Sequence, residues 1–124
     1  LSTSIIYHMV AGSARDTQLL KGVLDMCLLS IIKEEPSYGY EMVRKLQSRD
    51  LRLVSEGSIY PLLSRLEKGG LIESYLVQSH EGPARKYYRI TPAGEAALAE
   101  WVAEWRTFRD GVDHVLGGAD GLDR

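Results

Sequence analysis

The sequence predicts a mainly α-helical fold with one small β-hairpin. Three observations predict it. Apolar residues recur at helical spacing in three segments before residue 70; two short strand-like runs flank a Gly-Pro turn near residue 82; and a long periodic segment follows a Thr-Pro pair at residue 91. With 124 residues, the chain has room for one small domain.

The composition is that of a soluble globular protein, with 44% hydrophobic and 26% charged residues. The single cysteine, Cys27, excludes an intrachain disulfide and a cysteine-rich zinc site, and it favours a reducing compartment. No apolar run reaches the roughly 18 residues of a membrane span, and the N-terminal residues lack the positive region of a signal peptide. We therefore expect a soluble, cytoplasmic protein that makes no membrane contact.

The first helical pattern covers residues 16–35, where apolar residues alternate at spacings of three and one. This spacing predicts one continuous helix that is buried on more than one side. Pro36 ends it, because the residue before a proline disfavours the α conformation. Within the stripe, Cys27 is expected to be a small buried hydrophobe, since no base that would make it a nucleophile is evident nearby. Ser37 is expected to cap a second helix over residues 38–49.

The third helix contains two poor helix formers, Gly57 and Pro61, near its start. If Ser58 is the N-cap, Pro61 lies in the first turn, where its missing N–H costs nothing. If the helix begins at Ser55, a kink or a missing hydrogen bond follows. A pair of glycines after residue 68 ends the helix. Small residues at a helix start allow main-chain N–H groups to approach an anion closely, which suits contact with a phosphate backbone.

Residues 71–78 and 85–90 read as two strands of a hairpin, joined by a turn over residues 79–84. The second strand is basic and aromatic. Residues 50–55, which precede the third helix, alternate between apolar and polar side chains and suit either a brief strand or an extended linker.

The last helix is expected to begin after Thr91, with Pro92 at its first position, and to run to about Leu116. Its apolar residues are spaced three, four, three, four and three apart, which is the spacing of a coiled-coil seam. The seam consists of Leu98, Trp101, Trp105, Phe108, Val112 and Val115. Large aromatic residues on such a seam require a partner surface, so we expect a homodimer.

The formal net charge of −2 is distributed unevenly along the chain. Residues 37–90 carry a net charge of +3 and residues 91–124 a net charge of −4, which favours a central part that meets a polyanion. Three helices, a hairpin and a long helix follow one another in the order of a winged helix-turn-helix. In that fold the third helix enters the major groove of DNA and the hairpin touches the backbone.

Three segments resemble the PadR family of transcriptional regulators: LLKGVLDMCLLSIIKEEPSYGYEMVRKL, SEGSIYPLLSRLEKGGLIES and GPARKYYRITPAGEAAL. The resemblance runs from about Gln18 to Leu116. It implies a small homodimer that binds an inverted repeat in double-stranded DNA, usually as a repressor. Many members release DNA when a small aromatic or drug-like ligand binds near the dimer interface, between the first and last helices. The chain resembles the short form, which has a single C-terminal helix.

The resemblance and the element order together divide the chain into four parts. We expect an arm or extra helix over residues 1–17, a winged helix-turn-helix over 18–91, a dimerisation helix over 92–116 and a flexible tail over 117–124.

Candidate DNA contacts fall on three elements. On the third helix, Arg65 suits a guanine edge or a phosphate, and Lys68 suits a phosphate. On the hairpin, cations near the turn would form a phosphate clamp. At the start of the second helix, two tyrosines either touch the backbone or pack. The candidates are Tyr38, Tyr40, Ser58, Tyr60, Pro61, Ser64, Arg65, Lys68, His80, Arg85 and Lys86. The adjacent Tyr87 and Tyr88 must face opposite sides of the strand, so one of them packs on the core.

Catalytic and metal sites are not expected, because the three histidines lie far apart in the sequence with no suitable partner spacing. No cofactor is expected either. A winged-helix module that binds another protein, or only sequesters drugs, is the alternative to a regulator. For the last helix, Trp101 and Trp105 suit stacking on an aromatic effector as well as a plain hydrophobic interface.

Overall fold

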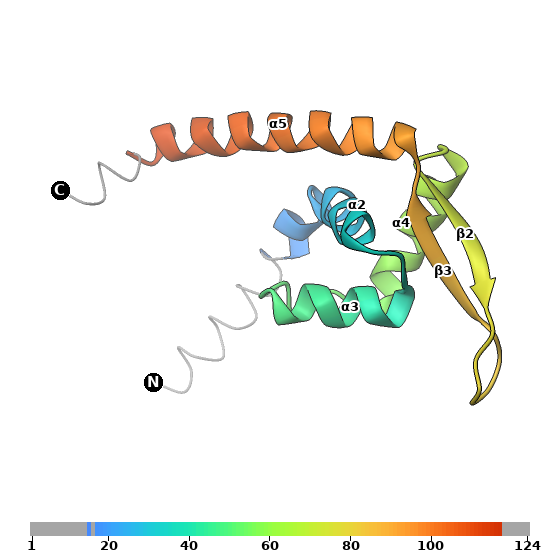
Figure 1. Cartoon of the computed structure of the whole chain (residues 1–124). Coiled ribbons are helices and arrows are strands. Elements are labelled where there is room, and N and C mark those ends of the chain that lie inside the picture. Colours follow the sequence, from blue (N-terminus) through green and yellow to red (C-terminus); the bar gives the residue numbers. More distant parts are fainter. Residues whose placement is uncertain (1–14, 16, 118–124) are drawn as a thin grey trace, which may run out of the picture.

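The structure is a computed structural model that describes residues 15 and 17–117. Within the described residues, the helices α2 to α5 and a three-stranded sheet follow a short helical stretch that ends at residue 21, which confirms the predicted mainly α class (Figure 1). In chain order they are α2 (Leu24–Glu34), β1 (Ser37–Tyr38), α3 (Gly39–Ser48), α4 (Glu56–Lys68), β2 (Ile72–Val77), β3 (Arg85–Ile90) and α5 (Pro92–Val115). None of the helices within the described residues is long and apolar enough to cross a membrane.

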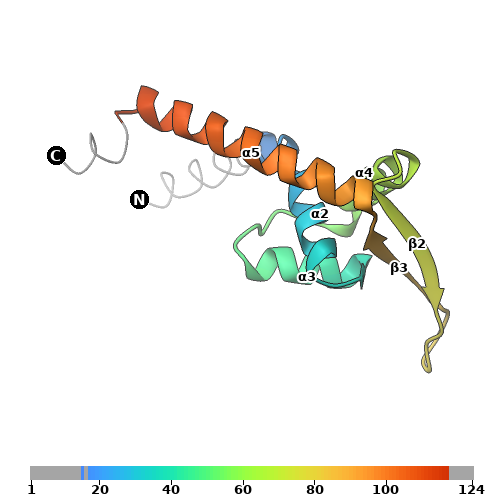
Figure 2. The same ribbon diagram turned by 45° about the horizontal axis from the view of Figure 1, so that its top comes forward.

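Helix α2 is the centre of the molecule. It packs against α3, α4, α5 and β3, and Leu28, Leu29, Ile31 and Ile32 are almost completely buried. Figures 1 and 2 show α5 and α3 on opposite sides of α2, while the hairpin of β2 and β3 projects from the end at which α5 begins. A helix with apolar residues on several sides is stable only in such a surrounded position.

The continuous helix expected over residues 16–35 is wrong, because a turn separates helical residues 17–21 from α2. The amide of Gly22 donates to the Leu19 carbonyl and that of Val23 to the Leu20 carbonyl, at 3.2 and 3.0 Å. These bonds reach three residues back, as in a tight turn, and glycine is a weak helix former at such a point. The arm and tail expected at the two ends lie almost wholly outside the described residues.

The prediction of Ser37 as a helix cap is also wrong, because this residue belongs to β1. It pairs with Tyr88 of β3, so the sheet has the order β1-β3-β2 and the hairpin gains a third strand. The buried Ser37 hydroxyl donates to the Glu35 carbonyl and accepts from Lys45 Nζ, both at 3.0 Å. The N-cap of α3 is Tyr38, whose amide donates to Glu41 at 3.2 Å.

Residues 50–55 form the linker rather than the strand. Val54 is buried and its carbonyl accepts from the Gln47 side chain at 3.0 Å, whereas Leu53 is exposed. The apolar alternation therefore does not correspond to two faces of a sheet.

The start of α4 answers the question raised by its glycine and proline. Ser55 is the N-cap, and its side chain and that of Ser58 each accept from the other's amide, at 3.3 and 3.0 Å. Pro61 therefore lies inside the helix, where it cannot donate to the Gly57 carbonyl. Both residues are on the exposed side, so solvent can reach this carbonyl. The chain tolerates a missing helical bond on the side of α4 that faces away from the core.

Helix α5 is fixed to the turn between α4 and β2. The Thr91 hydroxyl accepts from the Gly94 amide at 3.0 Å and donates to the Gly70 carbonyl at 2.7 Å, and the Thr91 amide donates to the Leu71 carbonyl at 3.0 Å. Gly94 lies so close to this turn that a Cβ atom there would come within 2.0 Å of the Leu71 oxygen. The first turn of α5 thus packs directly on backbone, and only glycine fits.

We predict that Gly94→Ala lowers the free energy of unfolding by about 3 kcal/mol, because backbone must move to admit the methyl group. Urea unfolding at a fixed chain concentration measures this free energy. Gly111→Ala in the same helix is the matched control, since nothing lies within 4 Å of its Cβ position. This control should gain about 0.5–1 kcal/mol from helix propensity. Equal stability of the two variants would contradict the packing described.

Candidate nucleic-acid interface

The outer surface of α4 consists of small residues followed by cations. Gly57, Pro61, Ser64 and Lys68 are exposed along one row, with Arg65 beside them. Arg65 and Lys68 form no ion pair with any residue in the described part of the chain, so both charges are available to an external anion. Helix α4 packs between α3 and β2, which leaves this row facing outward. Ser58 differs from the other candidates, because its hydroxyl is engaged in the cap and donates to the Ser55 carbonyl at 2.8 Å.

Tyr60 connects α4 to the first residue of α3. A Cβ atom on Gly39 would lie 2.5 Å from the Tyr60 hydroxyl oxygen, so the ring occupies the space that glycine leaves. The hydroxyl donates to Glu56 Oε1 at 3.1 Å. Burial, and then this hydrogen bond, raise the pKa of Tyr60 above its usual value, so the phenol remains protonated at neutral pH. Sequence reasoning named Tyr60 but missed Glu56, although the two stand four residues apart on one helix.

A row of tyrosine rings crosses the outer face of the sheet. The register places Tyr38, Tyr87 and Tyr75 on neighbouring strands, and their ring centroids are 5.3 and 6.0 Å apart. Guanidinium groups lie over two of the rings: Arg85 is 4.8 Å from the Tyr38 centroid and Arg89 is 4.7 Å from that of Tyr75. Ring contacts of this kind limit the freedom of both arginines. Arg89 Nε also donates to Glu73 Oε1 at 2.7 Å, whereas Arg85 forms no ion pair with any of the described residues. The sequence could not reveal the row, because it depends on the unpredicted strand β1.

The row continues onto α3. The Tyr40 ring lies 6.3 Å from that of Tyr38, and Arg44 Nη1 donates to the Tyr40 hydroxyl at 2.8 Å. Tyr38 and Tyr40 therefore contact each other, while Tyr40 in the first turn of α3 and Arg44 one turn later remain exposed. Arg44, Arg85 and Arg89 thus each lie over a tyrosine ring of this row.

The predicted pair of hairpin cations lies on opposite faces of β3. Arg85 shares the outer face with Tyr87, whereas Lys86 shares the inner face with Tyr88, which is the buried tyrosine of the two. Lys86 Nζ lies 3.9 Å from Glu67 of α4, and Glu67 also accepts from the Ser74 hydroxyl. Lys86 therefore helps to hold the hairpin on α4. His80 is exposed in the connecting loop.

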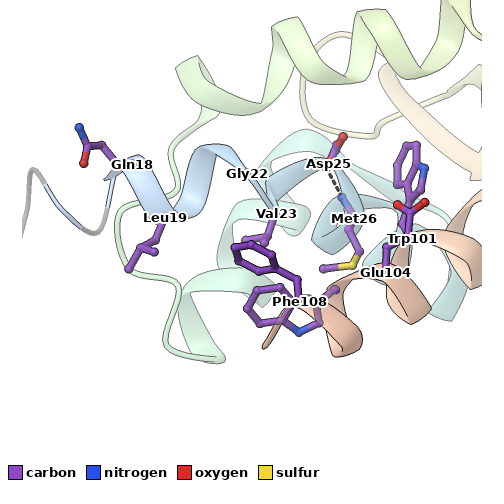
Figure 3. Close-up of a pocket in the computed structure, with 10 residues that line it drawn as sticks. Gln18, Leu19, Gly22, Val23, Asp25, Met26, Trp101, Glu104 and Phe108 are labelled. Atoms are coloured by element: carbon purple, nitrogen blue, oxygen red, sulfur yellow. Dashed lines mark hydrogen bonds between the residues drawn. The ribbon is translucent and has the colours of Figure 1, made fainter. Parts of the chain in front are cut away.

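A cleft of about 630 Å³ lies between α5 and residues 18–26 (Figure 3). Trp101, Trp105 and Phe108 line one side, and Leu19, Val23 and Met26 line the other. Of the predicted seam, Leu98 is buried in the core of its own chain and Trp101 packs against that core. Phe108 and Val112 are exposed beyond them.

Other chemistry has little support in the described residues. No group of three or more His, Cys, Asp or Glu side chains within them could hold a metal ion. Burial, followed by the charge of Asp25, raises the pKa of the Cys27 thiol, which makes it a poor nucleophile.

Taken together, the helix pair α3–α4, the hairpin beside it and the exposed cations define a winged helix-turn-helix protein of the DNA-binding kind. Known proteins resemble the chain over most of its length. A PadR-like regulator of Bacillus cereus is 48% identical, with a TM-score of 0.73, over 82% of this chain and 98% of its own. A PadR family regulator of Eggerthella lenta is 35% identical, with a TM-score of 0.79, over 90% and 96%. The transcriptional regulator Rv3488 of Mycobacterium tuberculosis is 41% identical over 65% of this chain and 71% of its own.

The sequence profile of the PadR-like family of transcriptional regulators matches residues 28–100. The chain belongs to this family and is a transcriptional regulator with a DNA-binding winged helix. Members of the family are regulators, not enzymes.

We predict that Tyr87→Ala loosens the hairpin, because Tyr87 is the ring that contacts both Tyr38 and Tyr75. Loss of two ring pairs should cost about 1–3 kcal/mol. The amides of β2 and β3 should then exchange faster with deuterium, while those of α2 remain protected. Tyr87→Phe is the control, since it keeps the ring. Unchanged exchange in Tyr87→Ala would show that the row of rings does not stabilise the hairpin.

Proposed function

We propose that the protein is a sequence-specific repressor that binds an inverted-repeat operator as a homodimer. Helix α4 enters the major groove, and the hairpin and the start of α3 contact the flanking phosphates. The observation that carries the proposal is the outer surface of α4. It consists of small residues followed by Arg65 and Lys68, which form no ion pair within the described residues. The hairpin and α3, which pack on either side of α4, carry further cations. A groove about 12 Å wide admits one such helix.

Phosphate contacts are assigned to the cations that the tyrosine rings hold. Arg44, in the middle of α3, lies over Tyr40, and Arg85, on the outer face of β3, lies over Tyr38. Rings that restrict an arginine reduce the entropy it loses when it binds a phosphate. Lys86 acts from the opposite face of the hairpin, where its ion pair with Glu67, at 3.9 Å, competes with a phosphate.

The dimer is assigned to α5. Its outer half extends past the other labelled elements in Figure 1 and carries the exposed Phe108, Val112 and Val115. A second copy that covers this stripe would place two α4 helices on one face of a duplex. They can both bind only when they are about one helical turn, roughly 34 Å, apart.

A small aromatic effector fits the cleft beside Trp101 and Trp105. Its volume lies in the range of ligand pockets, about 300–1,000 Å³, and flat rings suit stacking on indole. Since α5 forms one wall, a ligand there would change the angle between the paired α5 helices and thereby the separation of the α4 helices. Release of DNA would follow.

The proposal is tested by selecting bound duplexes from a random pool. We expect the wild-type chain to recover an inverted repeat whose half-sites are one helical turn apart. Arg65→Ala should lose the preference at one position of each half-site, by about 1–3 kcal/mol, because a base contact rather than only a phosphate contact is removed. Recovery of no common motif by the wild type would contradict the proposal and favour a module that binds protein or sequesters drugs.

Gly57→Ala tests whether α4 approaches DNA closely at its start. A Cβ atom here would meet only Ser55 Oγ, at 3.8 Å, so the free protein has room for it. We expect stability to rise by about 0.5–1 kcal/mol from helix propensity while operator affinity falls, because the methyl group occupies space that the duplex needs. Thermal unfolding and fluorescence anisotropy measure the two effects. Unchanged affinity would place the start of α4 away from the duplex.

A further inference from the structure

Glu56 is a carboxylate where a DNA-binding surface would be expected to carry only neutral or basic groups. It is the first residue of α4, it is exposed, and it lies one residue before the outer row begins at Gly57. A negative charge in this place is repelled by phosphates and lowers the affinity for every duplex alike. A hydrogen bond made only with the operator would offset this loss for the operator and for no other duplex.

The position of Glu56 is fixed rather than free. Its Oε1 accepts from the Tyr60 hydroxyl at 3.1 Å, and the Tyr60 ring is held against Gly39 of α3. Because this phenol keeps its proton at neutral pH, it acts as a steady donor. The other carboxylate oxygen of Glu56, Oε2, accepts no hydrogen bond from any of the described residues, so it can still accept one.

A carboxylate can only accept hydrogen bonds, and this decides what it recognises in the major groove. Guanine presents N7 and O6, which are acceptors and repel it. Cytosine presents the N4 amino group, which is a donor and the usual partner of glutamate. A carboxylate that opposes all phosphates but bonds one base edge lowers non-specific affinity more than specific affinity.

We infer that Glu56 is a specificity-determining residue that accepts a hydrogen bond from a cytosine amino group in each half-site, and that Tyr60 is its positioning residue. This inference rests on the proposed function, since it requires α4 in the major groove. It adds a discriminating contact that the basic residues do not supply.

A structural role for Glu56 predicts different results. An acidic residue in the first turn stabilises any helix through the helix dipole. Its removal would then lower thermal stability and leave the base preferences unchanged.

The test is selection of bound duplexes with the wild type, Glu56→Ala, Glu56→Gln and Tyr60→Phe. The wild-type motif should contain a cytosine at one fixed position of each half-site. Glu56→Ala should lose this preference and bind unrelated duplexes more tightly, so that the ratio of specific to non-specific affinity falls roughly 5- to 100-fold. Glu56→Gln should shift the preference towards adenine, which an amide bonds through N6 and N7. Tyr60→Phe keeps the ring on Gly39 and should weaken the cytosine preference without lowering the melting temperature.

The matched control is Glu100→Gln, which makes the same change of charge at an exposed position of α5. It should leave the motif and the affinity ratio as in the wild type. If all Glu56 and Tyr60 variants recover the wild-type motif, the inference is overturned while the proposed function stands. If the wild type itself recovers no motif, both fail together.

Discussion

The close packing of Gly94 on the Leu71 carbonyl is the constraint on which the arrangement of the molecule depends. It fixes the start of α5 to the turn that ends α4, with Thr91 bonded to both Gly70 and Leu71. Helix α4, which is proposed to bind DNA, and helix α5, which is proposed to form the dimer, therefore meet through backbone atoms rather than through adjustable side chains. A change in the direction of α5 must be passed to α4 or absorbed by strain, since packed interiors deform little.

The charges of the molecule also differ between its DNA-binding elements and α5. The cations of α3, α4 and β3 that form no ion pair within the described residues are Arg44, Arg65, Lys68 and Arg85, whereas residues 91–124 carry a net charge of −4. In Figure 1, α5 lies across α2 from α3, so α2 separates this acidic helix from α3. Such a distribution orients an approaching duplex before any contact forms. Tyrosine rings on the sheet and on α3 then hold the arginines that meet it.

Much of this fold could be predicted from sequence, because helical periodicity, the Gly-Pro turn and the Thr91-Pro92 start are local signals. The turn at Gly22 could not, since the apolar stripe continues across it without a break. Strand β1 consists of two residues and exists only because β3 is beside it, so Ser37 looked like a cap. The register of β1 in turn brings Tyr38 to Tyr87. In the candidate site, Arg65 and Lys68 are exposed as expected, but Ser58 is engaged in its own cap. The spacing of Glu56 and Tyr60 is a local signal, whereas the contact of the Tyr60 ring with Gly39 depends on the packing of α4 on α3.

The central claim is that paired chains present two α4 helices at the spacing of successive major grooves. Spin labels at Ser64→Cys, in a Cys27→Ala background, measure this separation directly by pulsed dipolar spectroscopy, because Ser64 is exposed on the outer row of α4. The account predicts one dominant distance near 34–36 Å, about one turn of DNA, for the free dimer. A strictly monomeric protein with no intermolecular distance, or a dominant distance that differs from this by 10 Å or so, would contradict it.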